Sequence, residues 1–190
     1  ADKPRVRGIV TALVVGEGKP EIYTDSLGRV KVQFHWDRES GMDAKGACFI
    51  RVAQMMAGQG WGSFFLPRVG MEVIVQFLDG DPDRPLITGC VYNGTHTPPY
   101  PLPDQKTKST TKSDSSPGGG GSNELRFEDA KGSEEVYVHA QKDLNELVEH
   151  DNTRTVRNDQ TFAITANQSF SVGGKQSFTV TGDRSPTVTE

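Results

Sequence analysis

From Leu144 onward the sequence repeats every eight residues. The octads read LNELVEHD, NTRTVRND, QTFAITAN, QSFSVGGK and QSFTVTGD, followed by the incomplete RSPTVTE. The fifth position is always valine or isoleucine, and the third becomes phenylalanine in the later complete octads. Turn-forming residues such as Gly174, Gly182 and Asp159 fill the last two positions. Each octad is therefore expected to form a short strand that ends in a turn.

The alternation within an octad predicts which face of the strand is buried. Side chains on a strand point to its two faces in turn, so the third and fifth positions share one face. Small polar residues such as Thr161, Ser177 and Thr181 occupy the other face. The predicted core residues are Val148, Val156, Phe162, Ile164, Phe170, Val172, Phe178, Val180 and Val188.

A single octad cannot fold alone. Ordering its backbone costs about 8–16 kcal/mol, whereas burying one Phe and one Val returns roughly 3–6 kcal/mol. A strand of about six residues spans only about 20 Å, which is one wall of a core. Three identical strands around an axis would complete the core and remove the sheet edges. The fold class predicted is all-β, with an intertwined homotrimeric β-helix from about residue 136 onward.

Two other interpretations of the repeat remain open. The octads could form a single-chain antiparallel meander with one face packed on another domain. Alternatively, Asp143 and Glu146 resemble a helix capping box, and Leu144, Leu147 and Val148 have helical spacing. The strand is favoured because Val148 already keeps the octad phase.

The first half of the chain has the pattern of a small β-barrel. Five strand-like segments are separated by strong turns, at 6–15, 29–36, 48–52, 72–78 and 86–92. This pattern favours a closed or partly open OB-type barrel within residues 1–102. The expected interior residues are Val30, Val32, Phe34, Val73, Val75 and Phe77.

A change of composition separates the barrel from the repeat. Residues 98–103 read PPYPLP, and a run rich in Thr, Ser and Lys then leads to GGGGS at 118–122. Residues 103–122 are therefore expected to be a linker. The third part, 123–190, is expected to begin with a hairpin whose strands at 125–128 and 136–138 flank a turn at 129–132.

Charge and hydropathy exclude some classes of function. Residues 1–102 carry eleven Lys and Arg against eleven Asp and Glu, and residues 103–190 carry ten against fourteen. This balance lacks the basic surface that nucleic-acid binding requires. No apolar run approaches the roughly 20 residues that span a bilayer. The chain begins at Ala1 and stops within an octad, which is typical of a segment of a longer protein.

No group of residues predicts an active site or a metal site. Asp79, Asp81 and Asp83 are spaced like the start of a calcium loop, but Arg84 stands where glycine is needed and Cys90 where a carboxylate is needed. The expectation there is a stiff connection between strands.

The histidines and cysteines also receive structural interpretations. His35 and Asp37 are expected to share one face of a strand end as a structural pair, without a nucleophile beside them. His139 and His150 occupy different octad positions, so stacking would not align them as ligands. Cys48 and Cys90 are expected to be buried free thiols, with a disulfide between them as the alternative. The sequence predicts no enzyme, no cofactor and no metal.

Four segments resemble one protein family. They are GRVKVQFHWD at 28–37, RPLITGCVYN at 84–93, NELRFEDAKGSEEVYVHAQKD at 123–143, and the Val-x-Gly octads at 172–174 and 180–182. Together they resemble the VgrG spike proteins of bacterial type VI secretion, which are relatives of the central spike of contractile-tailed phages. The resemblance covers essentially the whole chain.

The resemblance implies a structural role. It implies a non-enzymatic homotrimeric spike, in which an OB-fold domain leads into a β-helix needle that punctures target-cell envelopes and carries effectors. The implied partners are an Hcp-like tail-tube protein and a PAAR-type tip protein. Such spikes assemble in the bacterial cytoplasm and pass transiently through membranes into target cells. The family's N-terminal hub and distal needle tip have no counterpart in this sequence.

Two other functions are compatible with the same fold. An OB-fold module could bind a ligand or single-stranded nucleic acid on a platform of aromatic residues, although the neutral charge of the barrel argues against it. A phage-type tail spike would share the trimer and would carry a sugar site on its outer face. The candidate platform residues are Phe34, Trp36, Trp61, Phe64 and Phe65.

Overall fold

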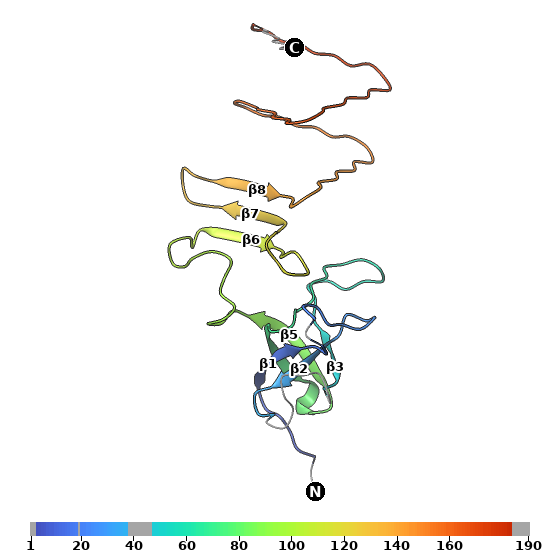
Figure 1. Ribbon diagram of the computed structural model, residues 1–190, viewed down its shortest axis with the longest axis vertical. Helices are drawn as coiled ribbons and strands as arrows, with labels where there is room; N and C mark the ends of the chain where they lie inside the picture. The colour runs from blue at the N-terminus through green and yellow to red at the C-terminus, as the bar shows by residue number, and fades with distance from the viewer. Residues whose placement is uncertain (1–2, 19, 38–46, 184–190) are drawn as a thin grey trace. The chain divides into compact units, whose positions relative to one another are not determined.

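The chain divides into two compact units, Ala1–Leu144 and Asn145–Glu190. The computed structural model describes residues 3–18, 20–37 and 47–183. Apart from one short 3-10 turn, every regular element in those residues is a β-strand (Figure 1), so the all-β prediction is confirmed. Within the same residues, no helix has the length and apolar character needed to cross a membrane.

Five strands of the first unit close into a barrel in the order β1-β2-β3-β5-β4. Strands β3 and β5 run parallel, and the other neighbours are antiparallel. This arrangement confirms the predicted OB-type barrel. Its elements are β1 (Ile9–Val15), β2 (Val30–Phe34), β3 (Phe49–Val52), β4 (Glu72–Phe77), the 3-10 turn η1 (Leu78–Gly80) and β5 (Pro85–Val91).

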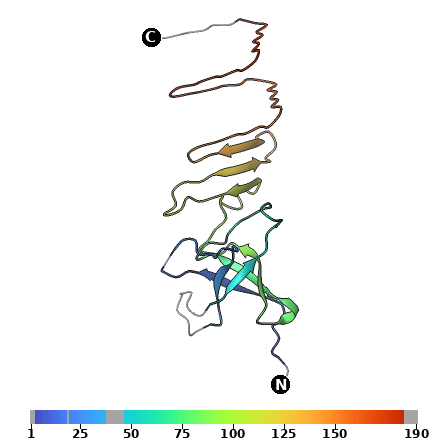
Figure 2. The same ribbon diagram turned by 90° about the vertical axis from the view of Figure 1, so that its right-hand side faces the viewer.

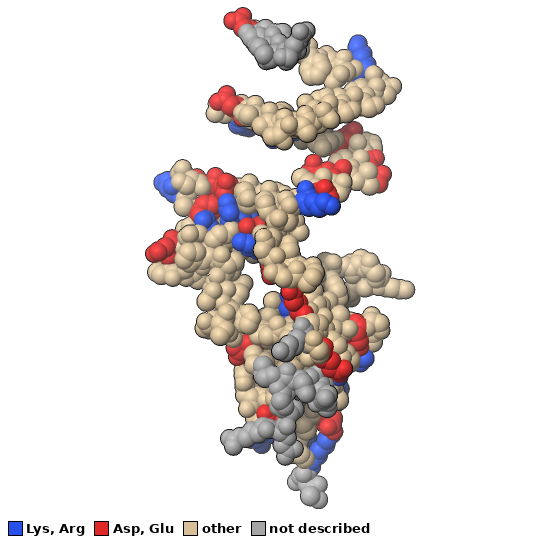
Figure 3. Space-filling model, viewed as in Figure 1, with Lys and Arg blue, Asp and Glu red and all other residues tan. Residues whose placement is uncertain are grey.

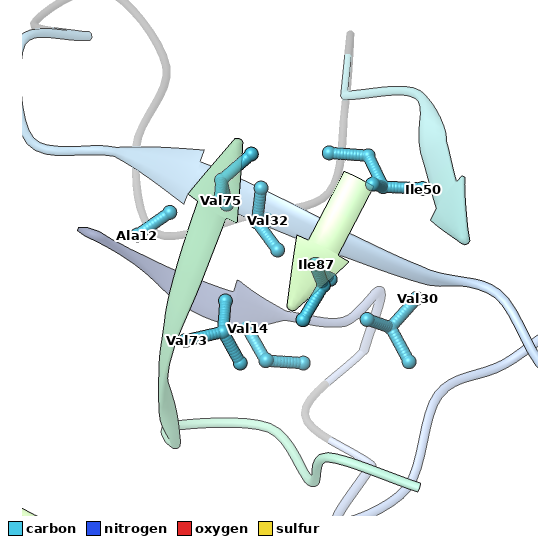
Figure 4. Close-up of a cluster of buried hydrophobic side chains, with 8 residues drawn as sticks. All are labelled: Ala12, Val14, Val30, Val32, Ile50, Val73, Val75 and Ile87. Carbon is cyan, nitrogen blue, oxygen red and sulfur yellow. The ribbon is translucent and has the colours of Figure 1, made fainter. Parts of the chain in front are cut away.

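Alternating aliphatic residues of all five strands fill the barrel (Figure 4). Each fully buried valine or isoleucine contributes roughly 1.5–3 kcal/mol to folding. Phe34 and Phe77, also expected inside, are partly buried at the edge of this core and stack on each other with centroids 5.9 Å apart. The core residues are Ala12, Val14, Val30, Val32, Ile50, Val73, Val75 and Ile87.

The first unit also contains a separate three-stranded antiparallel sheet (Figure 1). Its strands are β6 (Lys108–Lys112), β7 (Glu124–Glu128) and β8 (Glu135–His139), with β7 in the middle. The predicted hairpin is confirmed as β7 and β8.

Strand β6 lies in the segment whose composition predicts a linker, so that expectation is wrong at residues 108–112. Its register explains why the polar sequence pairs here. Lys108 stands opposite Glu128, and Lys112 stands opposite Glu124. Opposite charges facing each other across a ladder stabilise the pairing, and the threonines between them suit a strand.

In the second unit the chain bends at the period of the sequence repeat. Bends fall at 149–150, 157–158, 165–166, 173–174 and 181–182, always eight residues apart. Between them run elongated stretches without helix (Figures 1 and 2), so the helical interpretation of 143–150 is wrong. The bends occupy the sixth and seventh octad positions, one residue earlier than expected. Residues 145–183 form no strand ladder, which also disagrees with the single-chain meander.

Candidate self-association surface

The octads leave their apolar residues in water. Every described residue from 141 to 183 is exposed, and the phenylalanines at the third octad position are among the most exposed: Phe162 at 68%, Phe170 at 76% and Phe178 at 77%. The five other predicted core residues in the described part of the chain are exposed as well: Val148, Val156, Ile164, Val172 and Val180. Val188 lies outside the described residues. A regular series of unburied large apolar side chains marks an interaction surface.

One face of the three-stranded sheet continues this apolar pattern. Leu125 stands opposite Val138, and Phe127 stands opposite Val136, so the four side chains form two cross-strand pairs on one face. All four are exposed. Counting back eight residues from Leu144 gives an octad at 136–143, in which Val138 holds the third position, as Phe162 does later. We call these four residues the apolar sheet face.

The opposite face of the sheet is polar and densely bonded. The phenol of Tyr100 donates a hydrogen bond to Glu124 Oε1, and Thr110 Oγ1 donates to the same oxygen at 2.9 Å. Arg126 Nη1 donates to the phenol oxygen at 3.1 Å, and its Nη2 contacts Glu135 at 2.7 Å. In Figure 3, blue and red side chains gather around this sheet, whereas the described octads are mostly tan.

This cluster shifts the titration of its members. Hydrogen bonds from Tyr100 and Thr110, with the nearby cations Lys112 and Arg126, hold the pKa of Glu124 below its ordinary value although the side chain is buried. Hydrogen bonding to Tyr100 and Glu135 raises the pKa of Arg126. Both groups are therefore charged at neutral pH, and each charge has partners that offset its desolvation.

Hydrogen bonds connect the barrel to the turn that precedes β7. Arg68 Nη2 donates to the carbonyl oxygen of Asp114 at 2.7 Å, and Ser116 Oγ donates to Glu21 at 2.6 Å. The amide of Gly118 also donates to Glu21. These bonds to Glu21 lower its pKa. Residues 113–118, which composition predicts to be a linker, are therefore held by the barrel.

The aspartates that resembled a calcium loop are paired with cations. Lys3 Nζ lies 2.7 Å from Asp81 and 2.9 Å from Asp83. Asp79 contacts Arg84 at 3.0 Å. The three carboxylates thus divide between two cations at the connection between β4 and β5, and the expected structural role fits this pairing.

The interpretation of His35 and Asp37 as a pair on a strand end is wrong. Strand β2 ends at Phe34, and the chain turns there because the amide of Asp37 donates to the carbonyl oxygen of Phe34 at 3.0 Å. His35 Nε2 instead lies 3.1 Å from Thr11 Oγ1. The turn also lets Trp36 stack on Phe34, with ring centroids 4.5 Å apart.

The cysteines differ from their expected burial. Both Cys48 and Cys90 are free thiols, as the favoured interpretation had it, but both are exposed. Each lies near the end of a barrel strand, where neighbouring strands cover less of it. The burial prediction failed because apolar flanking residues indicate a strand but do not indicate which of its residues the neighbouring strands bury.

The remaining candidates are not gathered into one site. Of the proposed aromatic platform, Phe34 and Trp36 stack on each other, while Trp61, Phe64 and Phe65 belong to the segment between β3 and β4. His139 Nδ1 lies 2.8 Å from the carbonyl oxygen of Ser122. His150 contacts Asp151 at 3.0 Å. Each histidine thus has its own local partner.

Comparison with known families matches both parts of the chain. Residues 7–92 match the model of the type VI secretion system/phage-baseplate injector OB domain. Residues 109–190 match the model of the bacteriophage T4 gp5 C-terminal trimerisation domain. The second match includes both the apolar sheet face and the octads.

Curated relatives align with most of this chain. The chain is 58% identical over 149 residues to the type VI secretion system spike protein VgrG4b of Pseudomonas aeruginosa. It is 54% identical over 151 residues to the spike protein VgrG3 of Vibrio cholerae. The chain belongs to the VgrG family of spike proteins.

The matched segment is a small part of those VgrG proteins. It comprises 78% of this chain but 18% of VgrG4b, and 80% of this chain but 15% of VgrG3. A protein named actin cross-linking toxin VgrG1, from Vibrio cholerae, shares 50% identity over 149 residues, which is 14% of its length. The segment thus occurs in VgrG proteins named as spikes and in one named as a toxin.

Proposed function

We propose that the chain is a structural, non-enzymatic segment of a type VI secretion spike. In this spike three copies would associate, and the repeats that follow their OB barrels in the sequence would form one intertwined β-helix. The main support for this proposal is that the bends and the exposed apolar residues share the same eight-residue period. A single chain buries none of these positions. Neighbouring copies with the same period would bury all of them along one axis.

The physical demands of a puncturing needle agree with this proposal. A dry core of Phe and Val would give stiffness under axial load. The intervening Ser, Thr and Asn side chains would face outward and resist sticking to lipid. In the longer spike, such a needle would cross a target envelope and carry effectors, with an Hcp-like tube protein and a PAAR-type tip as partners. Assembly in the bacterial cytoplasm and delivery into target cells follow from that role.

A pair of substitutions in one octad tests the inward assignment. Phe170→Asp would place three carboxylates around the axis, where an unpaired charge is very costly to bury. Ser171→Asp adds the same charge on the other face of the same strand. We expect Phe170→Asp to abolish a heat-stable trimer and Ser171→Asp to retain it, as measured by mass in solution and thermal unfolding. Recovery of a heat-stable trimer from Phe170→Asp would refute the assignment.

A further inference from the structure

The segment between β3 and β4 presents an exposed apolar surface that the strand repeat does not explain. Residues 53–66, here called the apolar tip, read AQMMAGQGWGSFFL and contain no charged residue. Its large side chains are exposed: Met55 at 86%, Met56 at 53%, Trp61 at 66%, Phe64 at 64% and Phe65 at 59%.

The apolar tip is a built structure. The amide of Gly58 donates to the carbonyl oxygen of Trp61 at 2.8 Å, and the amide of Ser63 donates to that of Met56 at 2.9 Å. The side chain of Gln54 bonds both backbone groups of Phe65, at 3.0 Å and 2.9 Å. A surface already held in one conformation loses little entropy when it binds.

Two exposed aromatic rings of the tip lie against glycines on one side. A Cβ atom at Gly58 would lie 2.3 Å from the Trp61 ring, and one at Gly28 would lie 2.9 Å from the Phe64 ring. Residues of the tip, with Trp61 and Phe64 among them, line an open groove together with the turn at Leu27 and Gly28. Leu27 is itself 74% exposed, so this groove has an apolar rim as well.

The composition of the tip indicates a permanent partner. Obligate interfaces are the most apolar class, and their cores are rich in aromatic residues and Met and poor in charge. The tip is also connected to the region that matches the trimerisation domain. Arg68, two residues beyond it, donates to the carbonyl oxygen of Asp114, within the matched residues 109–190.

We propose that the apolar tip packs against a neighbouring copy of this chain, so that the trimer contact extends from the needle to the barrel. This inference rests on the proposed trimer and adds a second contact to it. The aromatic residues of each tip would be buried against the next copy. Threefold symmetry would repeat the same contact at all three copies.

Fluorescence quenching can test the cover over Trp61. The chain has two tryptophans, so Trp36→Phe leaves Trp61 as the sole reporter. We expect a particle of three chains in which Trp61 has lost most of its quenching by acrylamide, compared with the same protein in denaturant. A three-chain particle in which Trp61 is quenched freely would overturn the inference and leave the proposed function standing. A one-chain particle would defeat the proposed function itself.

Photo-crosslinking tests whether a neighbouring copy covers the tip, in a variant that keeps the natural Trp36. With p-benzoylphenylalanine in place of Trp61, irradiation of the full chain should give denatured bands at two and three times its 20.7 kDa mass. The same probe in place of Trp36, outside the tip, measures the background. If the three-chain particle gives only single-chain bands, or no more crosslinking than the probe at position 36, the tip does not contact a neighbour.

Discussion

At the scale of single residues, the polar face of the small sheet depends on a contact that the sequence does not reveal. Glu124 and Tyr100 are 24 positions apart, and they meet only because β6, β7 and the proline-rich segment adopt one particular arrangement. Glu124 retains only 6% of its side-chain exposure. A carboxylate this buried requires hydrogen-bond donors, and it has them in Tyr100 and Thr110.

Glu124→Gln is expected to destabilise the sheet by about 1–2 kcal/mol at pH 7, because it removes a charged acceptor. Since the folded pKa of Glu124 is lowered, its stabilisation is complete above the ordinary pKa near 4.5 and is lost as the pH falls through the folded value. The difference in melting temperature from the wild type should therefore shrink in acid. Asp129→Asn, in the exposed turn after β7, is the matched control. A difference that grows in acid would contradict this account.

Gly62 illustrates a residue whose backbone geometry excludes a side chain. Its φ is +136°, and a Cβ atom there would lie 2.4 Å from the carbonyl oxygen of Met56. We expect Gly62→Ala to cost about 1–3 kcal/mol through backbone strain and the clash. Gly94→Ala should cost much less, because nothing lies within 4 Å of its Cβ position. Equal melting temperatures for the two variants would show that the tip lacks this close contact.

At the scale of elements, sequence periodicity correctly predicted the strands and bends that depend on residues close together in the sequence. The alternation of Val73 and Val75 predicted a barrel strand, and the octads predicted bends eight residues apart. Strand β6 was missed because its ladder depends on charges supplied by β7, and no apolar alternation marks it. The strand predicted at 29–36 was too long at its C-terminal end, because the turn after Phe34 is set by one backbone hydrogen bond that the sequence does not reveal.

Deletions within the repeat test whether the octad is the structural unit. Removing residues 168–175 deletes one complete octad and keeps the phase of those that follow. Removing Ser171 alone moves every later side chain to the opposite face. We expect the octad deletion to retain the trimer and the single deletion to lose amide hydrogen-exchange protection after residue 171. If both deletions behave alike, the eight-residue unit does not set the register.

At the scale of the whole molecule, the barrel and the repeat solve the burial of apolar surface in different ways. The barrel encloses Val14, Val75 and Ile87 within one chain. The repeat leaves Phe170 and Val172 exposed in one chain, at 76% and 49%. The match of residues 109–190 to a trimerisation domain agrees with burial by association. The chain should therefore be stable only as an assembly over its C-terminal part.

The absolute mass of the chain in solution, measured by light scattering coupled to size exclusion, tests this account most directly. The account predicts a particle of three times the chain mass of 20.7 kDa, without dissociation on dilution through the column. A particle of one chain mass would mean that the octads do not associate, and it would contradict the intertwined needle.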